Sequence, residues 1–233
     1  MKVDVTGLSS GYGRITILRD LNLQVADGQI TAVLGRNGMG KSTLIHTLAG
    51  LLPATQGTIR LNGKDMTRAS VRDRARAGVT TVVQGRGIFP RLTVRENLIM
   101  GRVASGRAQR DRTDEVVAYF PRLGERMSQL AGTMSGGEQQ MLAIGRGLMT
   151  DPTLMLLDEP SDGIMPKLVT QIAETLVRIN QEQSMTVIIV EQNVPMVFRM
   201  ASHFMVMENG QSVFEADTAD VDMEDIMHRY LAI

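Results

Sequence analysis

The sequence predicts an α/β domain built on a parallel β-sheet with helices on both faces. Three short apolar runs are typical of strands buried on both sides, namely Ile30–Leu34, Leu154–Leu157 and Met185–Val190. Segments with helical periodicity follow these runs, and alternation of strand and helix is the pattern of a parallel sheet. A length of 233 residues with 43% apolar residues suffices for one domain, over residues 1–233, with a sizeable core.

The N-terminal part of the chain predicts antiparallel strands instead. Residues 1–31 alternate polar and apolar side chains, and we expect turns at Ser9–Gly11 and Ala26–Gly28. The segment Gly57–Gly63 predicts a further strand, which an Asn-Gly turn closes. These strands would form a β subdomain beside the parallel sheet.

A glycine-rich turn joins the first buried strand to a helix predicted over Ser42–Leu51. It has the spacing Gly-x-x-x-x-Gly-Lys-Ser, the phosphate-binding P-loop pattern, in its required strand–loop–helix setting. Backbone N–H groups beside glycines can approach phosphate oxygens, Lys41 supplies positive charge, and the Ser42 hydroxyl can bind Mg²⁺. The predicted phosphate-binding residues are Gly35, Arg36, Asn37, Gly38, Met39, Gly40, Lys41, Ser42 and Thr43.

Polar side chains also follow other predicted strands. Asp158 and Glu159 follow the second apolar run, Gln192 comes just after the third, and Gln84 follows a strand over Val79–Val83. Ligands bind at the carboxyl ends of parallel strands, so we expect these residues to converge on the P-loop. Asp158 can hold Mg²⁺, Glu159 can act as a general base, and the amide oxygen of Gln84 can reach the metal or a water.

The segment from about residue 86 to 150 is predicted to be an inserted helical subdomain. Thr93 and Glu96 have capping-box spacing at the start of its first helix. We expect breaks near Gly101–Gly106 and Pro121–Gly124, and a second glycine loop enters a helix at Ser135. Downstream, the sequence predicts a helix over residues 166–181, a hairpin around residues 209–210, and an acidic segment with a short helix at the end.

Composition excludes several classes of function. The chain has no cysteine, which rules out disulfides and thiolate metal sites. A formal net charge of zero gives no overall attraction to nucleic acid. The first residues lack the pattern of a signal peptide, and the longest apolar runs are far too short to span a bilayer. We therefore expect a soluble, cytosolic protein that does not bind nucleic acid.

The P-loop, the segment Ser135–Gln139 and the pair Asp158–Glu159 occur in an order that resembles the nucleotide-binding subunits of ATP-binding cassette (ABC) transporters. The resemblance covers about residues 3–215, and Ser135-Gly136-Gly137-Glu138-Gln139 is similar to the family signature Leu-Ser-Gly-Gly-Gln. It implies a P-loop NTPase fold with a RecA-like parallel-sheet core, an N-terminal antiparallel β subdomain and an inserted helical subdomain. It also implies ATP and Mg²⁺ as cofactors.

The resemblance assigns a role to each matching residue. Tyr12, which by itself suggests only a turn tyrosine, would stack on adenine. Gln84 would be the Q-loop glutamine near Mg²⁺, Asp158 the Walker B aspartate and Glu159 the catalytic base. The signature residues would contact the γ-phosphate held by a second copy in a head-to-tail dimer; these are Ser135, Gly136, Gly137 and Glu138.

Two departures from the family pattern concern catalysis. Gln192 stands where the family usually has a switch histidine, and glutamine can hydrogen-bond the γ-phosphate but cannot carry its proton. Met165 stands where the loop after Walker B commonly ends in aspartate. These departures leave open a regulatory nucleotide-binding module that does not hydrolyse ATP usefully.

The segments Gln84–Val94 and Val190–Asn193 resemble one branch of the family, the ATPases of bacterial importers for branched-chain and other hydrophobic amino acids, amides and urea. The resemblance implies an ATPase that drives solute import, with a urea or short-chain amide importer as the alternative. Its partners would be transmembrane permeases, a second ABC ATPase subunit, identical or different, and indirectly a periplasmic solute-binding protein. It would lie peripherally on the cytoplasmic face of the inner membrane.

Overall fold

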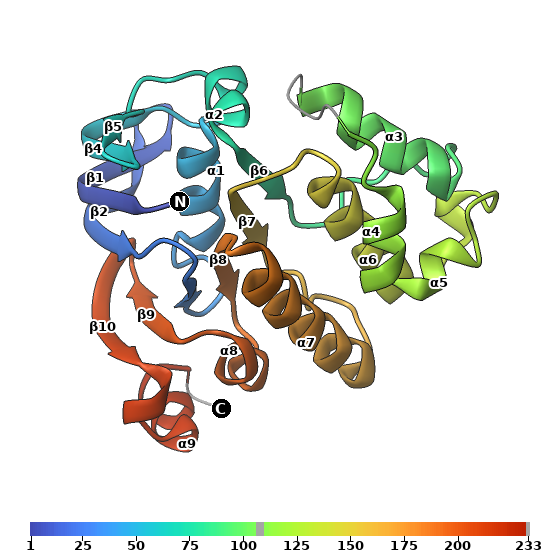
Figure 1. The fold of residues 1–233 in the computed structure, drawn as a ribbon. Helices are drawn as coiled ribbons and strands as arrows, with labels where there is room; N and C mark the ends of the chain where they lie inside the picture. Colours follow the sequence, from blue (N-terminus) through green and yellow to red (C-terminus); the bar gives the residue numbers. More distant parts are fainter. Residues whose placement is uncertain (106–109, 232–233) are drawn as a thin grey trace.

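The computed structural model describes residues 1–105 and 110–231, which form two β-sheets with helices around them (Figure 1). The larger sheet has the order β10-β9-β3-β8-β7-β6, and the smaller has the order β2-β1-β4-β5. The strands of the larger sheet are β3 (Ile30–Leu34), β6 (Val79–Val82), β7 (Leu154–Asp158), β8 (Thr186–Glu191), β9 (His203–Glu208) and β10 (Gln211–Asp217). Those of the smaller sheet are β1 (Val3–Tyr12), β2 (Ile15–Val25), β4 (Ala54–Leu61) and β5 (Lys64–Asp65).

The larger sheet confirms the predicted parallel core. Strands β9, β3, β8, β7 and β6 run parallel to their neighbours, and β10 pairs antiparallel with β9. The hairpin predicted near residues 209–210 therefore supplies both a fifth parallel strand and the antiparallel edge. In the register of the sheet, Leu34 lies opposite Glu191, and Asp158 lies opposite Val190. The ends of β3, β8 and β7 consequently meet at one edge.

The smaller sheet is antiparallel as expected, but one predicted turn is wrong. β1 continues through Ser9–Gly11 to Tyr12, with irregular pairing around Ser10, and the turn follows at residues 13–14. Gly11 is required inside the hairpin because a Cβ there would lie 2.0 Å from the carbonyl oxygen of Ile15. The glycine therefore permits close approach of two strands rather than a reversal of the chain. The turns at Ala26–Gly28 and at residues 62–63 are found as predicted.

Helix α1 (Lys41–Ala49) lies between the two sheets (Figure 1). Because side chains alternate along β7, Leu154 and Leu156 join the core around α1, while Met155 and Leu157 face the core on the other side. The second core is covered by α6 (Gly136–Leu148), α7 (Pro166–Gln183) and α8 (Val194–Met200). Burial on both faces explains why these strands are continuous apolar runs in the sequence.

The helices of the predicted helical subdomain lie together on one side of the larger sheet (Figure 1). They are α3 (Val94–Ser105), α4 (Thr113–Tyr119), α5 (Pro121–Gly124), the 3₁₀ turn η1 (Ala131–Thr133) and α6. The Thr93–Glu96 capping box forms at the start of α3, where the Glu96 carboxylate accepts from the Thr93 backbone N–H at 2.7 Å. Helix α2 (Val71–Ala77) lies outside this group, between β5 and β6 in the chain.

The break predicted near Gly101–Gly106 does not occur within the described residues. α3 continues through Gly101 to Ser105, and Gly106 itself lies outside the described residues. A Cβ at position 101 would lie 2.2 Å from the carbonyl oxygen of Arg146 in α6, so Gly101 allows the two helices to pack closely. The second predicted break is partly right, because Phe120 separates α4 from the short α5.

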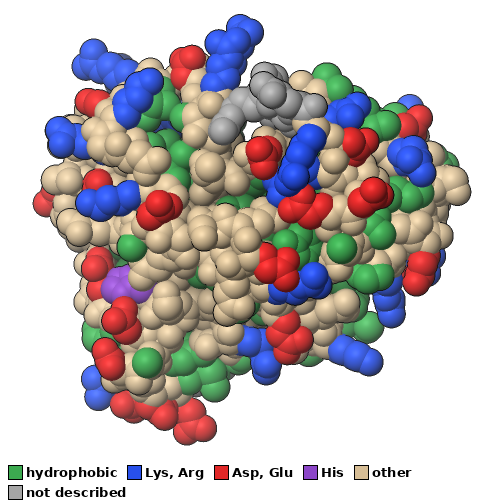
Figure 2. All heavy atoms as spheres, viewed as in Figure 1, with side chains coloured by type: hydrophobic (Ala, Val, Ile, Leu, Met, Phe, Trp, Pro, Cys, Tyr) green, Lys and Arg blue, Asp and Glu red, His purple; other side chains and the backbone are tan. Residues whose placement is uncertain are grey.

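The C-terminal part follows β10 with a 3₁₀ turn η2 (Thr218–Asp220), the short α9 (Met223–Ile226) and a π-helical turn η3 (Met227–Leu231). The rings of Tyr230 and Phe214 stack with centroids 5.4 Å apart, which holds this segment against β10. Figure 2 shows acidic side chains gathered over α9 at the lower left, and Lys and Arg side chains along the top around α2.

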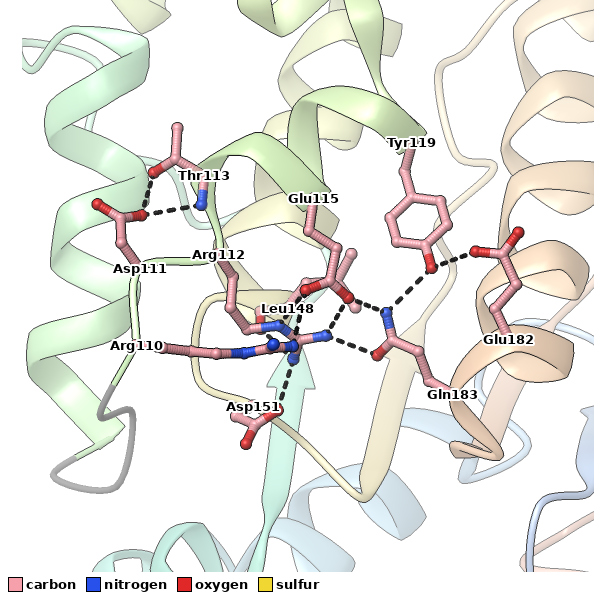
Figure 3. Close-up of polar contacts among 10 residues, drawn as sticks. All are labelled: Arg110, Asp111, Arg112, Thr113, Glu115, Tyr119, Leu148, Asp151, Glu182 and Gln183. Carbon is pink, nitrogen blue, oxygen red and sulfur yellow. Dashed lines mark hydrogen bonds and ion pairs between the residues drawn. The ribbon is translucent and has the colours of Figure 1, made fainter.

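A buried arginine ties the helical subdomain to α7 (Figure 3). The guanidinium of Arg112, at the start of α4, binds both carboxylate oxygens of Glu115, at 2.9 and 2.6 Å. It also donates to Asp151 at 2.8 Å, to the carbonyl of Leu148 at 3.0 Å, and to Gln183 at the end of α7 at 2.8 Å. The hydrogen bonds from Arg112 are the main reason why the pKa of the Glu115 carboxyl is lowered. One side chain thus connects three helices.

We expect Arg112→Met to destabilise the fold by about 2 to 3 kcal/mol, since it removes the buried donor to Glu115, Asp151, Gln183 and the Leu148 carbonyl, although Glu115 and Asp151 remain partly exposed to water. The matched control is Arg110→Met: Arg110 pairs with the same Glu115 at 3.1 Å but is exposed, so its loss should cost about 1 kcal/mol or less. Urea denaturation at neutral pH measures both. Glu115 has a lowered pKa, so its contribution is present above its ordinary pKa and is lost as pH falls through the lowered value. Equal losses for the two variants would contradict a structural role for Arg112.

Candidate functional site

The P-loop connects the end of β3 to the start of α1, and its glycines have specific backbone roles. Gly40 precedes α1 with a φ of 103°, a left-handed conformation that favours glycine. A Cβ at Gly35 would lie 2.7 Å from the carbonyl oxygen of Met207 on β9. Met39 also contacts the β9–β10 turn, since its carbonyl accepts from the Gly210 N–H at 3.0 Å. The loop is thus fixed between the sheet edge and α1.

The Lys41 side chain is buried inside this loop. Its ammonium donates to the carbonyl oxygens of Gly35, at 2.8 Å, and Arg36, at 3.1 Å. It also pairs with the Glu159 carboxylate at 2.9 Å. The positive charge predicted to meet phosphate is therefore held at the mouth of the loop by a carboxylate from the end of β7.

Asp158 lies behind the loop with one oxygen in use and the other without a partner. The Ser42 hydroxyl donates to its Oδ1 at 2.9 Å, while its buried Oδ2 has no hydrogen-bond partner. Burial raises the pKa of the Asp158 carboxyl, and the hydrogen bond from Ser42 opposes this shift. A buried carboxylate oxygen without a donor, beside a hydroxyl, suits Mg²⁺ or one of its waters.

Glu159 follows β7 in a strained conformation, with a φ of 45°. Its N–H donates to the Val190 carbonyl at 3.0 Å, which fixes the loop against β8. Its carboxylate accepts from the Gln84 amide at 3.0 Å and pairs with Lys41. Of the four residues that the sequence predicted would converge on the P-loop, Glu159 thus contacts Gln84 and Lys41, and Asp158 contacts Ser42. Gln192 makes no hydrogen bond to the P-loop within the described residues, but it lines a cavity with Asn37 and Glu159.

Two neighbouring cavities open at this edge of the sheet. The first, of about 380 Å³, is lined by Tyr12, Ile17, Asn37, Gly38, Gly40, Lys41, Ser42, Thr43, Gln84 and Glu159. Tyr12 lies at its rim, half exposed, and its hydroxyl is 3.3 Å from Nδ1 of His46. The second cavity, of about 470 Å³, contains Gln192 on its wall and shares Asn37, Gln84 and Glu159 with the first.

The signature residues lie apart from both cavities. Ser135 precedes α6 and forms a capping box with Glu138, whose carboxylate accepts from the Ser135 N–H at 3.0 Å and hydroxyl at 2.8 Å. Burial opposes ionisation of Glu138, yet these hydrogen bonds and the Arg126 and Arg122 guanidinium groups keep its pKa lowered. Gly136 and Gly137 form the first turn of the helix, which leaves its backbone N–H groups available to an anion.

The arrangement can bind a chain of phosphates and activate a water beside it. The P-loop and Lys41 supply an anion site, and Glu159 supplies a carboxylate next to it. No three His, Asp or Glu side chains gather into a metal cluster in residues 1–105 and 110–231.

Sequence reasoning missed three contributors to this edge. Ile17 lines the first cavity, His46 holds the Tyr12 hydroxyl, and Glu191 anchors the loops around the second cavity. Ile17 looked like any apolar residue of an alternating strand, and His46 like any helix residue. For Glu191 a signal existed, since a charged residue directly after four apolar strand residues is unusual in a buried strand.

Comparison with known proteins gives the context of this site. Residues 18–162 match the family model described as ABC transporter. The chain is 44% identical over 207 residues to the high-affinity branched-chain amino acid transport ATP-binding protein BraG of Pseudomonas aeruginosa, with 88% of each chain covered. It is 33% identical to the probable branched-chain amino acid transport ATP-binding protein LivF of Archaeoglobus fulgidus, over 89% of this chain and 88% of that one.

Solved structures agree with the fold. The ADP conformation of an ATP-binding cassette of an ABC transporter superimposes with a TM-score of 0.86 at 25% identity, over 98% of this chain and 96% of that one. A nucleotide-free cassette gives a TM-score of 0.84 at 25% identity, over 100% and 96%. The parallel-sheet core with its β and helical subdomains, as predicted from the sequence, is therefore confirmed.

We expect Asp158→Asn to raise the melting temperature at neutral pH by roughly 2 to 4 °C, because a buried ionised carboxylate costs stability and asparagine still accepts from Ser42. The Asp158 pKa is raised, so this cost develops as pH rises from its ordinary value of 3.8 through the raised value. The gain should therefore shrink towards pH 4. Calorimetry without nucleotide over this range measures it; a destabilised variant at neutral pH would contradict the assignment.

Proposed function

This chain belongs to the ABC transporter family, and we propose that it is the ATP-binding and ATP-hydrolysing subunit of an importer for branched-chain or other hydrophobic amino acids. The observation that carries the proposal is the position of Glu159 between Lys41 and Gln84, at the mouth of a P-loop cavity. An anion site for the phosphates with a carboxylate in contact is an arrangement that can hold ATP and activate a water beside it.

In the proposed mechanism, the phosphates of ATP replace Glu159 as the partner of Lys41. The released carboxylate then accepts a proton from a water whose oxygen bonds to the γ-phosphorus, while the bond from that phosphorus to the β–γ bridging oxygen breaks and ADP leaves. Ser42 and Asp158, with its free buried oxygen, would hold Mg²⁺ together with Gln84, and the ion would neutralise charge on the phosphates. Tyr12 would stack on the adenine at the rim of the cavity.

Gln192 is proposed to have a different role from that of the base, Glu159. It lines the cavity next to Glu159, where its neutral amide can hydrogen-bond the γ-phosphate without exchanging a proton. Glu159 must then accept the proton of the attacking water alone.

A second ABC ATPase subunit, identical or different, would complete the site. Ser135, Gly136, Gly137 and Glu138 line neither nucleotide cavity in this chain, yet they form the start of a helix of 13 residues. The N-terminus of this helix can bind an anion, but it does not line the cavities at the P-loop of the same chain. This supports a head-to-tail dimer in which each copy contacts the γ-phosphate bound by the other.

The permease contact is proposed on the outer side of α3. Ile99, Met100 and Val103 are exposed apolar residues at helical spacing. The loop after Gln84 is fixed to the same helix, since the buried Asn97 amide binds the backbone N–H and carbonyl of Phe89 at 2.9 and 3.0 Å. Motion at Gln84 would thus reach α3 directly.

No helix in the described ranges has the length and apolar content needed to cross a bilayer. We therefore place the chain peripherally, on the cytoplasmic face of the inner membrane, attached to the permeases. The solute assignment follows the names of the two relatives, and urea or a short-chain amide remains the alternative. A periplasmic solute-binding protein would act through the permeases.

Glu159→Gln should lower the steady-state ATPase rate by about a hundredfold or more, since the amide cannot accept a proton. Nucleotide binding should be kept or strengthened, because the neutral side chain no longer competes with phosphate for Lys41. Phosphate release and fluorescent-nucleotide titration measure the two quantities. An unchanged rate would remove Glu159 from catalysis, and a wild-type protein without ATPase activity would favour a regulatory nucleotide-binding module.

Cells that lack this chain should lose uptake of radiolabelled leucine, and the wild-type gene should restore it. Val103→Glu should fail to restore uptake, because a buried charge opposes apolar docking, while the purified variant keeps its ATPase rate. The matched control, Val213→Glu, places the same charge at an exposed valine on β10 and should restore uptake. Loss of urea or amide uptake instead of leucine uptake would support the alternative solute.

A further inference from the structure

Glu191 is the last residue of β8, and its side chain is only 2% exposed. β8 lies between β3 and β7, so Glu191 is level with Leu34, which directly precedes the P-loop. The preceding residue, Val190, pairs with Asp158 and accepts the N–H of Glu159 at 3.0 Å. Glu191 therefore stands at the centre of the three strand ends that carry the site.

The Glu191 carboxylate accepts hydrogen bonds from two different loops. From the loop after β7, Ser161 donates its backbone N–H to Oε1 at 2.8 Å and its hydroxyl to Oε2 at 2.9 Å. From the loop after β8, the backbone N–H groups of Gln192 and Asn193 donate to Oε2 at 3.0 and 3.1 Å. Ser161 comes two residues after Glu159, so one carboxylate anchors both the base and Gln192.

These four donors are uncharged, and they use both oxygens of the carboxylate. A buried carboxylate is costly unless hydrogen bonds satisfy it, and removing a single partner leaves an unsatisfied buried group. With its oxygens occupied by three backbone N–H groups and the Ser161 hydroxyl, Glu191 is not available to exchange protons with a substrate. Its chemistry suits it to hold loops, and the loops that it holds are those that flank the second cavity.

We propose that Glu191 is a positioning residue for hydrolysis, which keeps Glu159 and Gln192 in a fixed relation across the ends of β7 and β8. The inference rests on the proposed function, because it assigns to Glu191 the task of aligning the proposed base. It separates two properties of the site. Nucleotide binding depends on the P-loop, whereas the hydrogen bonds of the Glu191 carboxylate go to Ser161, Gln192 and Asn193. The rate of the chemical step depends on the alignment of Glu159, which these bonds maintain.

The test is Glu191→Gln in the full chain, with ATP turnover and nucleotide affinity measured separately. The amide nitrogen of glutamine must face a donor, so at least one of the four contacts is lost. We expect kcat to fall by about tenfold to a hundredfold, the size of effect that a misplaced catalytic group produces. The dissociation constant for a fluorescent ATP analogue should change by about threefold or less, because binding is a separate step.

Two further variants separate positioning from stability. Thr186→Val removes another buried polar group at the opposite end of β8, where its hydroxyl binds the Gly28 N–H at 2.9 Å; it should lower the melting temperature but keep kcat. Ser161→Ala deletes one contact of Glu191 and should lower kcat less than Glu191→Gln. The double variant at 161 and 191 should be no slower than Glu191→Gln alone, since both changes break one link.

A normal kcat in Glu191→Gln, or a loss of kcat in Thr186→Val that matches it at equal melting temperature, would overturn the inference. If Glu191→Gln does not fold, the test rests on Ser161→Ala, and an unchanged kcat in that variant would overturn the inference. Failure of the proposed function looks different. In that case the wild-type chain would not hydrolyse ATP, or Glu159→Gln would remain active.

Discussion

The parallel register of β3, β8 and β7 is the constraint on which the rest of this molecule depends. It brings the P-loop, the acidic pair at the end of β7 and the residues after β8 to a single edge, although the P-loop lies more than a hundred residues before the other two segments in the chain. The strands are buried on both faces, so a shift in register would move apolar side chains out of two cores at once. The sheet therefore fixes where the loops of the site begin, and the residues proposed for the chemical step, Glu159 and Gln192, lie on those loops.

The same edge concentrates polar groups that would be unfavourable elsewhere in the fold. Lys41, Asp158 and Glu191 are all buried, and burial raises the pKa of both carboxyls. Glu191 is satisfied entirely by neutral donors, whereas Asp158 keeps one oxygen without a partner. This difference matches the proposed roles, in which Glu191 positions two loops and Asp158 helps to hold Mg²⁺. The free-energy cost of burying these two carboxyl groups is offset by the apolar packing of the two cores that enclose the edge.

The sequence was most informative where a signal is local. Apolar runs, the P-loop spacing and the capping box at residue 93 each depend on a few consecutive residues, and the structure has them. Glycine was misleading at Gly11 and Gly101, because its role there is to let a distant backbone approach, and no local pattern records that. The contacts Gln84–Glu159 and Ser161–Glu191 join separate loops, so they could be inferred only once the strand order was known.

The pairing of Lys41 with Glu159 has a consequence for energetics. The carboxylate acts as a tethered competitor for the lysine, with an effective concentration set by the fold and unaffected by dilution. The measured binding free energy of ATP then reflects an exchange at Lys41, in which the phosphates of ATP replace the Glu159 carboxylate. Ionic strength should consequently act on both sides of that exchange and largely cancel, so nucleotide affinity would depend on salt less steeply than the charge of ATP suggests.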